Sequence, residues 1–139
     1  MAKVAFVCVG NAGRSQLATA LAERERDRRD LGDSIEIVTG GIEPHDHVHS
    51  DVIEVLREDG IDIGARTPRR ITADDVADAD YIVTMGCAVD AFAPPDWDGT
   101  SERWELKHPG GDDEDAVRAQ RDEIRDRVAD FFDRLDTAV

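Results

Sequence analysis

Lysine is almost absent from this 139-residue sequence: Lys3 and Lys107 are the only two, and arginine supplies nearly all of the positive charge. Aspartate and glutamate total 32 against 17 lysines and arginines, which gives a formal net charge of −15. No basic patch is available to neutralise phosphates, so nucleic acid is excluded as an expected partner. An acidic surface of this kind repels itself unless salt screens it. We therefore expect a halophilic protein that needs high salt to fold; an ordinary acidic cytoplasmic protein is the alternative.

Long apolar runs and a secretory signal pattern are also missing, which predicts a cytoplasmic protein that does not enter a membrane. Cys8 and Cys87 are the only cysteines. Two widely separated cysteines exclude a disulfide scaffold and favour thiol chemistry. The length predicts one domain, residues 1–139, that is large enough to bury a real core.

Strand-like and helix-like segments alternate along the chain, which predicts an α/β fold: a four-stranded parallel sheet with helices on both faces. Apolar runs predict strands at 3–7, 34–39, 80–85 and 102–106. Helical spacing predicts helices at 15–29, 51–59 and 114–135, and a further helix that starts at 72–75. We expect Ser50 to cap the second of these helices, Gly60 to end it and Thr72 to cap the short one.

The most informative segment lies between the first strand and the first helix, where Cys8 is followed by five residues, Arg14 and Ser15. The backbone N–H groups at a helix N-terminus have no partner within the helix, so they can bind an anion. Gly10 and Gly13 allow such groups to converge on one point. The segment therefore predicts a tetrahedral oxyanion held over the Cys8 sulfur. The oxyanion-binding residues we expect are Val9, Gly10, Asn11, Ala12, Gly13, Arg14 and Ser15.

The other residue types in this segment suit the same chemistry. Arg14 offers a planar fork that matches two oxygens of phosphate or arsenate. Asn11 tolerates a left-handed backbone and can hold the loop together through its side chain. Ser15 is expected to cap the following helix, and its hydroxyl can also donate to a thiolate. The alternative is an inert buried cysteine beside an ordinary glycine-rich turn.

The Cys-x5-Arg-Ser pattern after the first strand resembles the low-molecular-weight protein tyrosine phosphatase superfamily, and most closely its thioredoxin-type arsenate reductase branch. The resemblance covers nearly the whole chain and implies the phosphatase fold with flavodoxin-like winding. It also implies that Cys8 is the nucleophile, Arg14 the oxyanion ligand, Asn11 the loop organiser and Ser15 the thiolate stabiliser. Segments that resemble the reductase branch are Arg14-Ser15-Gln16 and residues 39–44, 60–63, 67–70, 83–87 and 121–124.

Cys87 follows the third strand as Cys8 follows the first, and parallel strands bring both to one edge of the sheet. The reductase resemblance implies that Cys8 attacks arsenate and that Cys87 then forms a disulfide with Cys8 as arsenite leaves. Thioredoxin or a small thiol would restore the enzyme, and no bound cofactor is expected. The alternative for Cys87 is a small buried side chain.

Two positions depart from the family pattern. Thioredoxin-coupled reductases usually carry a third cysteine before a proline, where this chain has Ala93-Pro94. Family members also have Asp-Pro before the last helix, where this chain has His108-Pro109. We therefore predict that His108 is the general acid, with Asp112 or Asp113 as substitutes and a surface histidine without a role as the alternative.

Three histidines, His45, His47 and His49, alternate in one segment, so an extended chain would place them on one side. Alternating histidines can bind zinc or nickel, but we expect solvated residues at the pocket rim and no metal site. The aromatic residues Phe92, Trp97 and Trp104 either line the pocket or anchor loops.

The leading hypothesis for function is a thiol-dependent arsenate reductase, supported by Gln16 and Cys87. The alternative is a phosphatase that hydrolyses phosphotyrosine or small aryl phosphates through a phosphocysteine on Cys8. A third reading is a non-catalytic oxyanion-binding regulatory module on the same fold.

Overall fold

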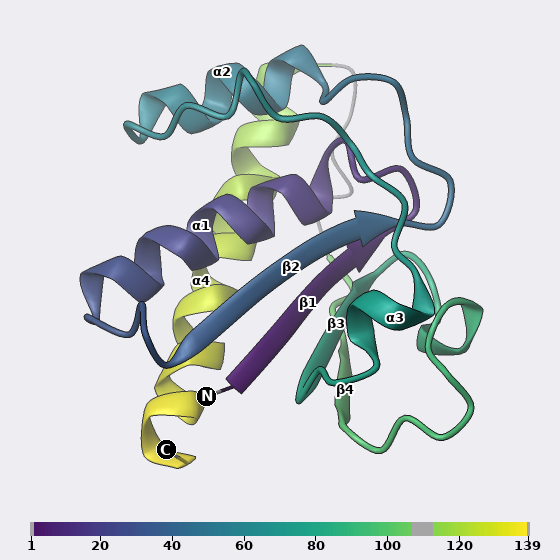
Figure 1. The fold of residues 1–139 in the computed structure, drawn as a ribbon. Helices are drawn as coiled ribbons and strands as arrows, with labels where there is room; N and C mark the ends of the chain where they lie inside the picture. The colour runs from purple at the N-terminus through teal and green to yellow at the C-terminus, as the bar shows by residue number, and fades with distance from the viewer. Residues whose placement is uncertain (1, 107–112, 139) are drawn as a thin grey trace.

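Four parallel strands form the centre of the computed structural model, which describes residues 2–106 and 113–138 (Figure 1). They run in the order β2-β1-β3-β4, and every neighbouring pair is parallel. The predicted α/β class and parallel four-stranded sheet are therefore confirmed. The strands are β1 (Ala2–Cys8), β2 (Ile35–Gly41), β3 (Tyr81–Met85) and β4 (Thr100–Arg103).

Helices cover the two faces of the sheet unequally (Figure 1). The three longest, α1 (Arg14–Arg28), α2 (Ser50–Glu58) and α4 (Glu114–Ala138), lie on one face. The other face is covered by the four-residue α3 (Ala73–Val76), the short 3₁₀ helix η1 (Val89–Ala91) and loops. Helices on both faces are thus present as predicted, but the second face depends mainly on loop side chains.

Alternating residues of β1 divide the core between the two faces. Phe6 and Cys8 pack with the first cluster, under α1 and α4, whereas Ala5 and Val7 pack with the second. Cys87 belongs to the second cluster. The two thiols therefore enter the core from opposite faces of the sheet, although both lie at its carboxyl edge, where Cys8 pairs with Met85.

Two of the predicted helix caps are wrong. Helix α1 begins at Arg14, one residue before the predicted start, and Ser15 lies inside it with its hydroxyl turned to the Cys8 sulfur. Helix α2 begins at Ser50 itself, after His49, and no side chain caps it. In both cases the first-turn N–H groups stay free of side-chain oxygens, which leaves them available to a ligand.

The other two helix signals are confirmed. Thr72 accepts a hydrogen bond from the Asp75 N–H and Asp75 returns one to the Thr72 N–H, which forms the reciprocal cap that starts α3. Gly60, just after α2, has the left-handed φ of +78° that glycine adopts without strain.

The fourth strand lies two residues earlier than predicted. Residues 102–106 were expected because Trp104 and Leu106 are apolar, but β4 is the polar segment Thr100–Arg103 at the sheet edge. Trp104 instead leaves the strand and packs in the core against Phe6 and Phe131. An edge strand needs backbone pairing with only one neighbour, so its side chains need not be apolar.

Helix α2 is fastened to α4 by ion pairs. Glu58, at the end of α2, accepts hydrogen bonds from Arg118 at 2.9 and 2.6 Å and from Arg121 at 3.2 Å. The bonds from Arg118, assisted by those from Arg121, lower the pKa of Glu58 to about 2. These contacts fix the two helices whose side chains form one side of the cavity described below.

No helix in the described part of the chain is both long and apolar enough to cross a membrane.

Candidate active site

The loop between β1 and α1 is held from outside by the segment that follows β2. Its carbonyl groups accept backbone hydrogen bonds from that segment, so they point away from the Cys8 sulfur. The remaining N–H groups of the loop are thereby left to face inward, which is the arrangement an anion requires. The bonds run from the N–H groups of Ile42, Glu43, His45 and His49 to the carbonyls of Cys8, Val9, Gly10 and Ala12, at 3.3, 2.9, 2.9 and 3.0 Å respectively.

Asn11 stands at the centre of this loop. It is fully buried, and its φ of +52° is the left-handed conformation that asparagine tolerates. Its side-chain nitrogen donates to the Ser15 hydroxyl at 2.7 Å and to the Thr39 hydroxyl at 3.0 Å. Its oxygen accepts from the Arg69 N–H at 3.0 Å and from the Gln16 amide at 3.2 Å. The side chain thus ties the loop to α1, to β2 and to the segment before α3.

Cys8 lies at the bottom of the loop, 3% exposed. Its sulfur is 3.0 Å from the Ser15 hydroxyl and 3.2 Å from the Asn11 N–H, which donates to it. The Ser15 oxygen already accepts a hydrogen bond from the Asn11 side chain, so its own hydrogen is free to point at the sulfur. Two hydrogen-bond donors are therefore directed at one sulfur, which is the arrangement expected around a cysteine nucleophile.

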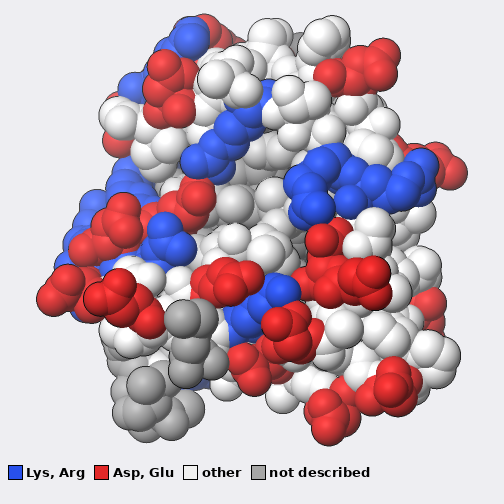
Figure 2. Space-filling model, in the orientation of Figure 1, with Lys and Arg blue, Asp and Glu red and all other residues white. Residues whose placement is uncertain are grey.

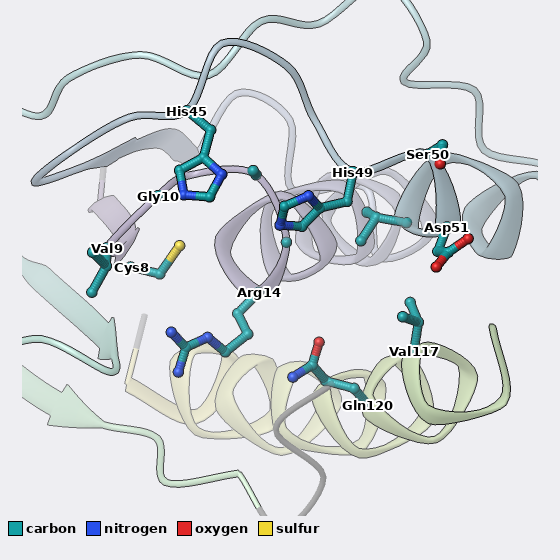
Figure 3. A pocket seen from close by; sticks show the side chains of 13 residues that line it. Cys8, Val9, Gly10, Arg14, His45, His49, Ser50, Asp51, Val117 and Gln120 are labelled. Atoms are coloured by element: carbon teal, nitrogen blue, oxygen red, sulfur yellow. The ribbon is translucent and has the colours of Figure 1, made fainter. Parts of the chain in front are cut away.

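Arg14, the first residue of α1, extends its guanidinium toward Cys8 (Figure 3). The guanidinium lies flat on the backbone of Gly86, just after β3: a Cβ built on Gly86 would stand 2.5 to 2.8 Å from three of its atoms. Gly86 also has a left-handed φ of +84°. Two features therefore favour glycine at this position: its left-handed backbone and the lack of room for a Cβ beside the arginine. Gly86 is a functional position that the sequence motifs did not identify; its signal was a glycine directly after a buried strand.

The loop opens into a cavity of about 530 Å³ (Figure 3). On the side away from Cys8 it is bounded by the start of α2 and by α4. Two of the three alternating histidines, His45 and His49, lie at this cavity, whereas His47 does not. The expectation that all three histidines lie on one side of their segment is therefore wrong. The described lining residues are Cys8, Val9, Gly10, Ala12, Gly13, Arg14, His45, His49, Ser50, Asp51, Val52, Val117 and Gln120.

The described residues form no metal-binding cluster, and the three aromatic side chains considered above lie away from the cavity. The described residues contain no group of three or more histidine, cysteine, aspartate or glutamate side chains placed to hold a metal ion. Trp104 is a core residue, and Trp97 donates from its indole N–H to the Ala79 carbonyl at 2.9 Å. Phe92 packs on the second face of the sheet. All three aromatic residues are anchors, and the cavity wall within 2–106 and 113–138 contains none of them.

Cys87 lies at the same edge of the sheet as Cys8, two residues beyond β3. Both cysteines are free thiols. The Cys87 sulfur is 3.8 Å from the Val7 carbonyl. Burial raises the pKa of the Cys87 thiol, and the neighbouring Cys8 adds to the rise. Cys87 is thus protonated more readily than an ordinary thiol, and its sulfur is close enough to Cys8 for charge on one to affect the other.

The predicted general acid, His108, lies outside the described residues, as does Asp112. Asp113, the other substitute, is described: its carboxylate accepts a hydrogen bond from the Ala116 N–H at 2.8 Å at the start of α4. A side-chain oxygen used in this way caps the helix and is already engaged by the backbone. This arrangement argues against Asp113 as a proton donor.

Comparison with known proteins agrees with this geometry. The family model for low molecular weight phosphotyrosine protein phosphatase matches residues 3–139. A Halobacterium salinarum protein named "Putative arsenate reductase" is 49% identical over 133 residues, which cover 96% of this chain and 92% of that protein. The glutaredoxin arsenate reductase of a Synechocystis species is 32% identical, covering 97% and 99% of the two chains.

A solved structure with the same fold is the thioredoxin-dependent arsenate reductase of Corynebacterium glutamicum, with a TM-score of 0.82 and 31% identity. The match covers all of this chain and 64% of the length of that one. Family model, relatives and structure agree with one another and with the Cys-x5-Arg loop. The chain therefore belongs to the low molecular weight phosphotyrosine protein phosphatase family.

Proposed function

We propose that this protein is a thiol-dependent arsenate reductase. The observation that carries the proposal is the position of the two cysteines: Cys8 at the base of an oxyanion loop after β1, and Cys87 two residues beyond the neighbouring strand β3, at the same edge of the sheet. A phosphatase needs only the first of these thiols, whereas a reductase needs both. The relatives named as arsenate reductases support the same reaction.

The proposed reaction uses the two thiols as the source of two electrons. The Cys8 thiolate attacks the arsenic of arsenate while Arg14 and the loop N–H groups bind the other oxygens, and one oxygen leaves as water after protonation. The Cys87 sulfur, after losing its proton, then attacks the Cys8 sulfur. The S–As bond breaks with its electron pair going to arsenic, which departs as arsenite, and a Cys8–Cys87 disulfide remains.

An external thiol must then reduce the disulfide before the next turnover, and because the sequence has no third cysteine, that thiol must attack the Cys8–Cys87 bond directly. The names of the relatives include thioredoxin and glutaredoxin dependence, so we propose thioredoxin, a related redox protein or a small thiol as the reductant. The cytoplasm, where such thiols are kept reduced, is the proposed location.

Hydrolysis of aryl phosphates is the second candidate activity, because Cys8, Arg14 and the loop would supply a nucleophile and oxyanion donors without Cys87. The cavity favours it less. Its described walls include imidazole, carboxylate, amide and valine side chains but no phenylalanine, tyrosine or tryptophan ring on which a phenyl group would stack.

The decisive assay measures arsenate reduction with a thiol reductant beside hydrolysis of p-nitrophenyl phosphate, both in concentrated KCl. Acidic and basic side chains intermingle on the face shown in Figure 2, but the net charge of −15 favours unfolding when salt does not screen it. We expect multiple-turnover arsenite production at high salt and its loss, together with the folded circular-dichroism spectrum, at low salt. Hydrolysis without arsenite production would make the protein a phosphatase. Phosphate binding with neither activity would make it a regulatory module.

His108 is the proposed proton donor to the leaving oxygen. We expect His108→Ala to slow phosphate esters with poor leaving groups at least tenfold more than those with good ones, because only a poor leaving group needs its oxygen protonated. Hydrolysis rates for a series of aryl phosphates of different leaving-group pKa test this. An equal effect across the series would remove His108 as the acid.

A further inference from the structure

Two imidazole rings cover the two glycines of the oxyanion loop. A Cβ built on Gly10 would stand 2.6 and 2.7 Å from two ring atoms of His45, and one built on Gly13 would stand 3.4 Å from the ring of His49. The rings meet edge to face, with centroids 5.4 Å apart. Each residue is also fixed through its backbone N–H, which donates to the loop. The glycines thus admit two histidine rings to the rim of the site.

These rings lie across the cavity from Arg14. Figure 3 shows the Cys8 sulfur between His45 and His49 on one side and the guanidinium on the other. All four side chains line the same cavity. His45 and His49 are both exposed and both line the cavity, so a ligand bound there can approach their rings.

A tetrahedral oxyanion positioned for attack leaves part of its surface beyond the reach of the loop. The oxygen opposite the sulfur points toward the cavity, because the nucleophile and the leaving oxygen lie roughly in line. The loop N–H groups and Arg14 reach the remaining oxygens from below and from one side. Hydrogen-bond donors on the side of His45 and His49 would complete the contacts to the oxyanion. A neutral imidazole supplies one N–H donor for this purpose.

We propose that His45 and His49 are binding residues of the oxyanion site, whose ring N–H groups hold the outer edge of the bound arsenate or phosphate. This inference rests on the proposed oxyanion site but not on whether the protein reduces arsenate. Among the described lining residues, the titratable groups beside the two histidines are the Cys8 sulfur, the Arg14 guanidinium and the Asp51 carboxyl group.

The test uses His45→Phe and His49→Phe, which keep a flat ring over each glycine and remove its N–H groups. Inorganic phosphate is the probe: we measure the phosphate concentration that halves the rate at which iodoacetamide alkylates Cys8, in concentrated KCl. We expect each variant to need about tenfold more phosphate than the wild type, the effect of losing one hydrogen bond to a charged group. The matched control is His47→Phe, from the same segment but outside the cavity, which is expected to bind phosphate normally.

Two further variants separate binding from packing. His45→Asn and His49→Asn lose the ring but retain an N–H donor, so we expect them to bind phosphate more tightly than the phenylalanine variants. The opposite order, or wild-type phosphate binding in both phenylalanine variants, would show that the rings only pack on the loop and would overturn the proposal. Because no turnover enters this measurement, failure of arsenate reduction would not affect it. Phosphate that does not protect wild-type Cys8 would overturn the oxyanion site itself.

Discussion

Replacing Cys87 with serine is expected to stop arsenate reduction while leaving hydrolysis of p-nitrophenyl phosphate close to the wild-type rate. Hydrolysis needs Cys8, Arg14 and the loop, none of which bonds to Cys87 in the structure. Reduction needs a second sulfur to attack Cys8. A neighbouring thiol has an effective concentration that a dissolved thiol cannot match, so we expect multiple-turnover arsenite production to fall at least about a hundredfold.

The pH dependence of the disulfide-forming step provides an independent check on the role of Cys87. Burial raises the pKa of Cys87, and only its thiolate attacks, so the disulfide-forming step should accelerate as pH rises above neutrality. Stopped-flow measurement of disulfide formation after one arsenate addition tests this.

The Cys8→Ser variant is the control for Cys87→Ser, and it should lose both arsenate reduction and aryl phosphate hydrolysis. Equal loss of both activities in Cys87→Ser would show that Cys87 is structural and not the resolving thiol.

Replacing Arg14 with lysine is expected to lower kcat/KM about 10²- to 10³-fold for both arsenate and aryl phosphate, the usual cost of losing a donor to a developing oxyanion. Lysine keeps the charge but not the planar fork that binds two oxygens at once. Steady-state kinetics on both substrates measure the effect. A loss confined to one substrate would mean that Arg14 does not bind the group that the two have in common.

The contact between Arg14 and Gly86 allows the same loss to be produced without changing Arg14. In Gly86→Ala the new methyl group would stand 2.5 Å from a guanidinium nitrogen, so the arginine must move and activity should fall at least tenfold. The matched control is Gly60→Ala: Gly60 has a similar φ of +78°, but a Cβ there meets no atom within 4 Å. Both variants should lose about 1 to 2 kcal/mol of stability from backbone strain, and only Gly86→Ala should lose activity. Equal activity in both would contradict the positioning role of Gly86.

Sequence patterns located the elements that depend on neighbouring residues. The Thr72 cap and the Gly60 helix end were predicted because each is set by dihedral angles and hydrogen bonds within a few residues. The Ser15 cap was wrong because the hydroxyl is directed to the Cys8 sulfur, the partner that the family resemblance implied for it, and not to the helix backbone. The fourth strand was misplaced because Trp104 is needed in the core and not in the sheet.

The sequence alone determined the α/β class, the order of the elements and the Cys8-to-Ser15 loop, because the spacing of residues along the chain dictates their local backbone geometry. Only the tertiary structure decided which distant residues meet that loop. It brought His45 and His49 to the cavity and left His47 outside. It packed the Arg14 guanidinium against Gly86, and it placed Cys87 at the same edge of the sheet as Cys8 but on the opposite face. These contacts join segments about 30 to 80 residues apart, and their formation depends on strand order and side-chain packing, which no local pattern encodes.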